Sequence, residues 1–337
     1  LSATTRRTLL ACGVAAAVSA SFNAPIAGVL FAHEVILAHY ALRAFVPIVL
    51  ASVAGALISR IHFGSSAAFI IPDYQITSYL EFPAFVLLGV TCAVVAILFE
   101  LSIMITERLS WRFKMPLWLR PACGGLAVGA IAVFLPQVLG VGYDATDMAL
   151  KNQWPLTLLL VLIVAKTVAT AITLASRMAG GVFSPSLYLG AMTGSAFGLI
   201  ASSAFPEMAS SNGLYALLGM GAVAAAVLGA PVSTTVIVFE LTGGFEMTIA
   251  LLLTVSVAHG LSHAVLGHSY FHWQLVQRGL SLHEGPHKEI MRRMRVSRFM
   301  TVLEPYEDPP GDLCPIEKSW LSPTDTLEDA LRAFDRS

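Results

Sequence analysis

The residues from Gly180 to Ala191 interrupt two long apolar segments in a way that suits anion binding. Gly180 and Gly181 free the backbone, and Pro185 favours the first turn of a new helix. The first N–H groups of such a helix have no acceptor within it and lie at the positive end of the helix dipole. The pattern therefore predicts either an anion site built from backbone amides or a packing break between two helices.

Four isolated charges lie in or beside apolar segments. A carboxylate inside a membrane, such as Glu34 or Glu240, is unfavourable unless it is partnered or hydrated. Each of these two can cap backbone groups or carry protons, and we favour the capping role. Lys166 and Arg177, near the predicted site, can attract anions to an entrance or simply mark the membrane interface.

Two other chemistries have weaker support in the sequence. His259 and His263 are four residues apart on one helical face, but no carboxylate or cysteine completes a metal site. We therefore expect packing histidines and no metal. Ser184 or Ser186 paired with a histidine would make an intramembrane hydrolase, a remote alternative because no histidine is close to Ser184 in sequence. We expect no enzyme.

The composition is that of an integral, multi-pass membrane protein. Of 337 residues, 56% are hydrophobic and 12% are charged, whereas soluble domains carry about 25% charged residues. Of the 41 charged residues, 19 lie at 281–337, so we expect a membrane domain at 1–280 and a soluble segment after it. Lipid is an expected partner, and the membrane body has no basic stripe to suggest nucleic acid. The four cysteines show no ligand or disulfide spacing.

Apolar runs predict the helices that must position these groups. They lie at 8–22, 25–39, 44–59, 83–106, 121–135, 154–176, 186–205, 213–229, 231–244 and 247–266. Several are shorter than the ~20 residues that cross a bilayer straight, as in transporters and channels with broken helices. Segments 61–82 and 136–153 are predicted as loops, and 326–334 as the start of an amphipathic helix.

Basic residues follow two of the apolar runs and set the expected orientation, because positive loops favour the cytoplasm. One group follows residue 106, and the other follows the last membrane segment. We therefore expect a cytoplasmic C-terminus. The residues are Arg108, Arg112, Lys114 and Arg120 in the first group, and Lys288, Arg292, Arg293, Arg295 and Arg298 in the second.

The chain contains an internal repeat. In each copy an Ala-Pro pair opens a helix, and a lone glutamate follows nine residues after the proline, at Pro25 and Glu34 and again at Pro231 and Glu240. Chance similarity between two alanine-rich helices is the alternative. Transporters often hold substrate between such repeats. Gly181 lies fifty residues before Pro231, so its counterpart is expected before Leu1, and the chain is expected to be part of a longer protein.

Three motifs resemble those of the chloride channel and chloride/proton exchanger (CLC) family. Gly180-Gly181-Val182-Phe183-Ser184-Pro185 is similar to its GxFxP anion motif. Phe22-Asn23-Ala24-Pro25-Ile26-Ala27-Gly28-Val29-Leu30-Phe31 resembles FNAPLAG(V/I)LF, and the segment from Ala230-Pro231 to Phe239-Glu240-Leu241-Thr242 resembles AP…E(L/M)T. The resemblance covers about 1–285.

The resemblance implies an all-α inverted repeat with broken and tilted helices, in a homodimer whose subunits each hold a pore. It implies a voltage-gated type of chloride channel or a related transporter. The dehydrated anion would be held at Gly181 to Pro185, including Ser184, by the N–H groups of Val182 and Phe183. The family's serine motif and gating-glutamate motif would precede Leu1.

Two positions depart from the family pattern. A tyrosine hydroxyl normally completes the central site, and Phe271 stands at that position with Tyr270 beside it. Phenylalanine has no hydroxyl, so that bond is lost unless Tyr270 supplies it. Proton-coupled members often carry a glutamate where Val35 stands, next to Glu34. Since valine carries no proton, we expect passive conduction, with chloride/proton antiport as the alternative.

The tail at Pro323 to Ala330 resembles the first half of a cystathionine-β-synthase (CBS) regulatory motif. A complete pair of such motifs can bind adenine nucleotides. The chain is expected to contain only the start of such a domain, so no cofactor is predicted for it.

Overall fold

The computed structural model describes residues 3–40, 42–64, 79–112, 116–206, 209–242, 247–277, 291, 294–300 and 321–334. The chain divides into two compact units, Leu1–Arg278 and Gly279–Ser337. Regular structure in the described ranges is helical, apart from one isolated bridge, which confirms the predicted all-α class.

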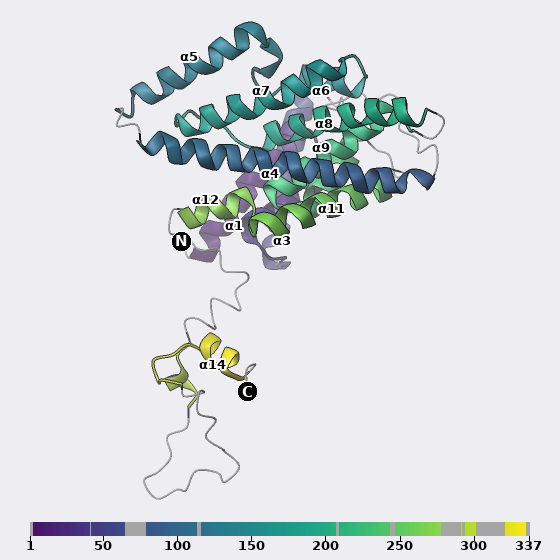
Figure 1. Ribbon diagram of the computed structural model, residues 1–337. Coiled ribbons are helices and arrows are strands. Elements are labelled where there is room, and N and C mark those ends of the chain that lie inside the picture. Colours follow the sequence, from purple (N-terminus) through teal and green to yellow (C-terminus); the bar gives the residue numbers. More distant parts are fainter. Residues whose placement is uncertain are drawn as a thin grey trace, which may run out of the picture. The chain divides into compact units, whose positions relative to one another are not determined.

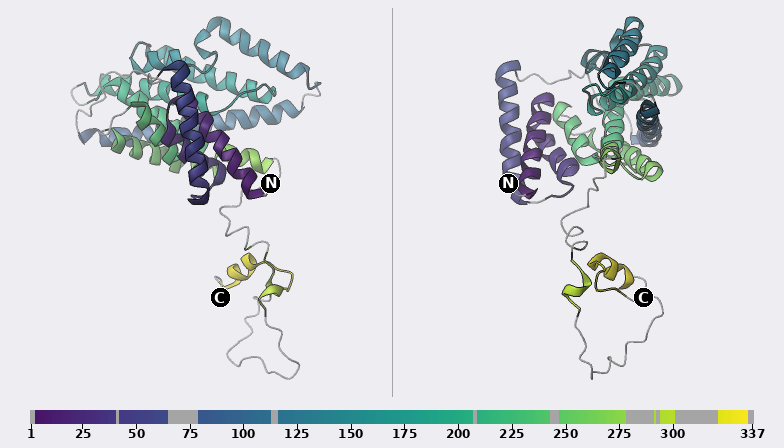
Figure 2. Two further views of the ribbon diagram at one scale, coloured as in Figure 1. Left: turned by 180° about the vertical axis from the view of Figure 1, so that it is seen from behind. Right: turned by 90° about the vertical axis from the view of Figure 1, so that its left-hand side faces the viewer.

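The first repeat packs through small residues. Helix α1 (Ala3–Phe22) lies against α3 (Leu42–Phe63) and α2 (Pro25–Phe31) (Figure 2). A Cβ added to Gly28 would lie 2.7 Å from the Ala15 carbonyl oxygen, so only glycine allows this approach. After α2 the predicted helix 25–39 continues as a π-helical segment, η1 (Ala32–Leu37).

The long helix α4 (Phe82–Arg112) runs beside several later helices (Figure 1). At its start lies a short 3-10 turn, η2 (Tyr79–Glu81), while residues 65–78 of the predicted loop lie outside the described part. Glu81 is 4% exposed, and its hydrogen bonds join the start of α4 to the connection between α8 and α9. Its carboxylate accepts from the Ser210 N–H (2.6 Å), the Ser210 hydroxyl (2.5 Å) and the Tyr215 hydroxyl.

The predicted loop at 136–153 proved to be partly helical. It contains the 3-10 turn η3 (Pro136–Val138) and helix α6 (Tyr143–Leu150), between α5 (Leu119–Phe134) and α7 (Leu156–Ala175). Helix α6 forms because one face of it, with Ala145, Ala149 and Leu150, is buried. This apolar pattern is too short to be recognised in the sequence, where glycines and charged residues surround it.

Helices α8 (Phe183–Ala204) and α9 (Asn212–Leu228) pack closely along their length. Gly190 and Gly194 of α8 lie directly against the α9 backbone, where a Cβ at Gly194 would collide with the Tyr215 carbonyl oxygen. Spacing of small residues by four lets helix backbones approach in a membrane.

The membrane unit ends with α10 (Pro231–Thr242), α11 (Thr248–Leu266) and α12 (Tyr270–Gln277). Within the described residues, five helical stretches are long and apolar enough to cross a membrane, and four apolar helices are shorter. The five are 42–63, 82–112, 156–175, 183–204 and 248–277.

In the C-terminal unit, Arg295 pairs with Thr326 in an antiparallel bridge. Helix α14 (Leu327–Phe334) follows, close to the predicted amphipathic helix. Thr326 and Asp329 cap its start: the Thr326 N–H and hydroxyl both donate to Asp329 Oδ2, at 3.1 and 2.6 Å. The basic residues 288, 292 and 293 lie outside the described part.

Candidate anion site

Helix α8 begins where the sequence predicts a helix start. Val182 is its N-cap residue and Phe183 its first residue, two positions before Pro185. Gly180 and Gly181 lead into it and are exposed, whereas Val182 is buried. The N–H groups of this first turn have no acceptor within the helix and carry the positive end of its dipole. Anion binding by these groups stays a prediction.

The connection before α6 is bound to the start of α8. The Ser184 hydroxyl donates to the Val141 carbonyl at 2.9 Å. The Lys166 ammonium donates to the carbonyls of Val138 (2.8 Å) and Gly140 (2.9 Å). The interpretation of Lys166 as an entrance charge was therefore wrong: its buried side chain holds this connection in place.

Phe183 joins the two motif regions. Its ring lies 4.9 Å from the ring of Phe22 and 5.4 Å, edge to face, from the ring of Phe31, measured between centroids. Phe22 ends α1 and Phe31 ends α2, so both aromatic residues of the first-repeat motif meet the first residue of α8. Segments about 150 residues apart in sequence thus pack together at the start of α8.

The two lone carboxylates cap each other's repeat. Glu34 accepts from the N–H groups of Val232 (3.1 Å) and Ser233 (2.8 Å) at the start of α10, and from the Ser233 hydroxyl (2.6 Å). Glu240 accepts from the N–H groups of Ile26 (3.0 Å) and Ala27 (2.8 Å) at the start of α2. The capping interpretation is confirmed.

The equal spacing from proline to glutamate therefore has a structural cause. Each helix opened by an Ala-Pro pair carries the carboxylate that caps the other one. Val35 follows Glu34 within η1 and packs against the main core. Both oxygens of the Glu34 carboxylate accept hydrogen bonds, and its neighbour is apolar.

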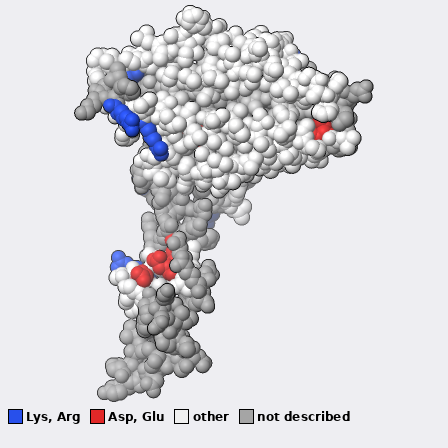
Figure 3. Space-filling view, in the orientation of Figure 1, with Lys and Arg blue, Asp and Glu red and all other residues white. Residues whose placement is uncertain are grey.

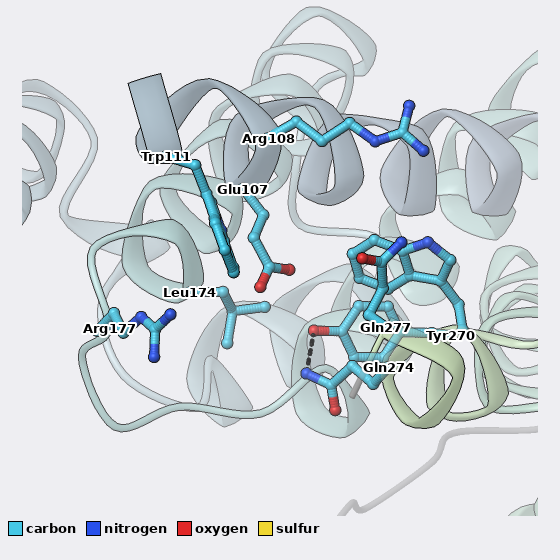
Figure 4. Close-up of a pocket in the computed structure, with 9 residues that line it drawn as sticks. Glu107, Arg108, Trp111, Leu174, Arg177, Tyr270, Gln274 and Gln277 are labelled. Carbon is cyan, nitrogen blue, oxygen red and sulfur yellow. Dashed lines mark hydrogen bonds between the residues drawn. The ribbon is translucent and has the colours of Figure 1, made fainter. Parts of the chain in front are cut away.

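Tyr270 and Phe271 play different parts. Phe271 packs against the main core, 6.0 Å from the Tyr270 ring between centroids. Tyr270 is 2% exposed, and its hydroxyl accepts from the Gln274 amide at 2.9 Å (Figure 4). That hydroxyl lines a separate cavity between α4, α7 and α12.

The hydroxyls considered for nucleophilic chemistry donate to main-chain carbonyls. Ser184 donates to Val141 at 2.9 Å, and Ser186 donates to Phe183 at 2.6 Å. A serine nucleophile would instead donate to a base. His259 and His263 lie 6.0 Å apart between ring centroids, and no cluster of three potential metal ligands occurs in the described residues.

Known proteins are similar to this chain in sequence and in fold. Residues 1–263 match the family model "Voltage gated chloride channel". A putative chloride channel protein ClcB-like of Ralstonia nicotianae is 32% identical over 258 residues, covering 77% of this chain and 60% of that protein. The H(+)/Cl(−) exchange transporter ClcA of Vibrio cholerae is 31% identical over 283 residues, covering 82% and 60%.

The fold is also that of a solved structure. A slow cyanobacterial Cl−/H+ antiporter superimposes with a TM-score of 0.73 at 23% identity, covering 82% of this chain and 66% of that one. The chain spans 60% of the length of the two curated relatives. Because the family model matches most of its length, the chain belongs to the voltage-gated chloride channel family.

Proposed function

We propose that this chain forms part of a chloride pathway across a membrane and that it conducts the anion passively. The observation that carries the proposal is the convergence at the start of α8, where Phe183 meets Phe22 and Phe31 beside unpaired helix N–H groups. The names of the relatives, a chloride channel and an H(+)/Cl(−) exchanger, support chloride as the substrate.

In this proposal the N–H groups of Val182 and Phe183 hold the dehydrated anion. Gly181 leaves room for it, since a Cβ there would meet no atom of the structure within 4 Å. Ser184 and Pro185 set the turn, through the bond to Val141 and the fixed proline φ. Phe271 provides no hydroxyl, so the anion has one donor fewer than in relatives with tyrosine.

Passive conduction is favoured over antiport by the residues around the first capping carboxylate. Val35 carries no proton, and Glu34 is bound by three donors at the start of α10. Antiport is the second candidate function, because one relative is named an exchanger. An intramembrane hydrolase has little support, since the Ser184 and Ser186 hydroxyls donate to carbonyls.

We further propose a homodimer with one pore in each subunit, and a C-terminal unit on the cytoplasmic side. The bridge between Arg295 and Thr326 followed by α14 supports the start of a CBS-like fold. Adenine nucleotide would bind only where a complete pair of such motifs is present.

The full-length protein in liposomes tests the function. A chloride gradient should drive chloride efflux when potassium ions can also cross the membrane and balance the charge. A pH gradient should leave the chloride reversal potential unchanged. Gly181→Val should slow the flux, whereas Gly129→Val on α5, where an added Cβ also meets no atom within 4 Å, should not. Proton movement against its own gradient, driven by the chloride gradient, would show that the protein is an antiporter. Absence of flux together with labelling by a serine-reactive probe would contradict transport altogether.

A further inference from the structure

A cavity of about 630 Å³ lies between the C-terminal ends of α4 and α7 and the helix α12 (Figure 4). The 31 residues of α4 are about 46 Å long, whereas the hydrocarbon core of a bilayer is about 30 Å thick. A helix of this length that crosses the core extends beyond it, and we place the C-terminal end of α4 in the headgroup layer. The basic residues near this end of α4 and the start of α5 form the blue area of Figure 3, consistent with an interfacial position.

The cavity contains charges of both signs that do not pair with each other. Glu107 and Arg108 come from α4, and Arg177 comes from the turn after α7. Figure 4 shows the Glu107 carboxylate pointing into the cavity from a helix and the Arg177 guanidinium pointing into it from the turn after α7. Within the described part of the chain, no salt bridge within 4.0 Å joins any of these three side chains. A ligand can therefore meet both kinds of charge.

Arg177 is placed at some conformational cost. Its φ is +60°, a left-handed conformation that glycine normally supplies after a helix. Its guanidinium lies 5.9 Å from the centre of the Trp111 ring. Trp111 is 67% exposed, and Trp273 also lines the cavity. Tryptophan is enriched at the headgroup level of membranes, where its ring covers acyl chains and its N–H faces water.

We propose that this cavity binds the headgroup of a phospholipid that carries both a phosphate and a primary ammonium group, as phosphatidylethanolamine does. The phosphate lies against Arg177, with Arg108 at the rim, because guanidinium groups bind phosphate oxygens in a bidentate manner. The ammonium donates to the Glu107 carboxylate. Gln274 and Gln277 offer amide groups to the remaining oxygens. The ligand's position at the bilayer surface matches that of the cavity.

The choice of headgroup follows from the presence of both negative and positive side chains in the cavity. Phosphatidylglycerol satisfies the arginines but leaves Glu107 without a cation. Phosphatidylcholine has a cation without N–H donors, so it forms no hydrogen bond to a carboxylate. Only the primary ammonium headgroup meets both requirements. The proposal does not depend on whether the protein passes chloride.

Lipid retention by the purified full-length protein tests this proposal. Native mass spectrometry measures the relative affinity for phosphatidylethanolamine, phosphatidylglycerol and phosphatidylcholine with identical acyl chains. We expect phosphatidylethanolamine to bind about fivefold more tightly than either of the others. This ratio is the gain in affinity expected from one additional contact between a headgroup charge and a protein charge. Glu107→Gln should abolish this preference without weakening phosphatidylglycerol binding, and Arg177→Gln should weaken binding of all three lipids about fivefold.

Arg43→Gln is the matched control, because Arg43 is an exposed arginine at the start of α3 that does not line the cavity. It should change none of the three affinities. Equal retention of the three lipids by the unaltered protein would overturn the proposal, as would a loss in Arg43→Gln equal to that in Arg177→Gln. Displacement of the bound lipid by free phosphoethanolamine at the same concentration would assign the cavity to a soluble phosphate ester instead.

Discussion

At the scale of single residues, the two capping carboxylates give the first prediction. Removing Glu34 or Glu240 leaves the partly buried N–H groups of Ser233 or Ala27, at the start of the opposite helix, without their side-chain acceptor. Loss of such a cap costs about 0.5–2 kcal/mol. We expect Glu34→Ala and Glu240→Ala each to lower the thermal unfolding midpoint of the purified protein.

The corresponding glutamine variants are the controls for that experiment. A glutamine keeps one carbonyl acceptor but loses the charge, so Glu34→Gln and Glu240→Gln should fall between the unaltered protein and the alanine variants. Hydrogen bonds to charged groups are about twice as strong as neutral ones. An alanine variant as stable as the unaltered protein would show that the cap contributes nothing.

Two other buried glutamates provide a matched pair for a second prediction. Glu81 has three donors, from Ser210 and Tyr215, whereas both carboxylate oxygens of Glu100 are buried with no hydrogen-bond partner in the described structure. Glu100 is 0% exposed in the middle of α4. An ionised carboxylate without donors is strongly disfavoured there, so we expect Glu100 to be uncharged.

Glutamine substitution should therefore affect the two positions differently. Glu81→Gln replaces a charged acceptor of three hydrogen bonds and should cost about 2 kcal/mol of stability. Glu100→Gln replaces one neutral polar group by another of the same shape and should cost less than about 1 kcal/mol. Unfolding midpoints measured in the same detergent compare them. A larger loss at Glu100 than at Glu81 would show that Glu100 is ionised and partnered.

At the scale of elements, the contact between α8 and α9 depends on glycine. A Cβ at Gly194 would collide with the Tyr215 carbonyl oxygen, which belongs to the backbone and cannot turn away. Gly194→Ala should separate the helices and cost about 1–3 kcal/mol. Gly129→Ala on α5 is the control, because its Cβ meets no atom of the structure within 4 Å and alanine favours a helix. Equal midpoints for the two variants would contradict this account of the packing.

The elements also show where sequence reasoning succeeded and failed. Long apolar runs predicted α4, α7, α8 and α11, because burial in a membrane dictates their composition. Helix α6 was missed, since eight residues give too few turns for a periodic pattern. Lys166 was misinterpreted because its acceptors, the Val138 and Gly140 carbonyls, come near it only in the folded chain.

At the scale of the whole molecule, the repeat predicted equivalent positions but not their partners. The spacing from Pro25 to Glu34 and from Pro231 to Glu240 indicated equal roles. That each carboxylate caps the opposite repeat depends on how the two halves pack. Similarly, the helix start before Pro185 was predictable from local chemistry, whereas the cavity beside Arg177 depends on three elements distant in sequence.

The orientation of the molecule in the membrane gives the last prediction. Helix α4 runs to one end of the membrane unit, and α5 returns from there towards α6 (Figure 1). Leu117 and Asp144 therefore lie towards opposite ends, and both are exposed. Basic residues around Leu117 favour the cytoplasm. In a cysteine-free background, Leu117→Cys should be protected from a membrane-impermeant maleimide added outside sealed cells.

Asp144→Cys should react with the external reagent, and Thr324→Cys in the C-terminal unit should be protected like Leu117→Cys. Permeabilising the membrane should make the two protected positions reactive, which shows that they are accessible to the reagent. The physical reason is that the apolar helix α5 separates the two positions: it begins after Leu117 and leads through η3 to α6, which contains Asp144. Labelling of Leu117→Cys and Asp144→Cys from the same side would mean that the chain does not return across the membrane through α5, and it would contradict this orientation.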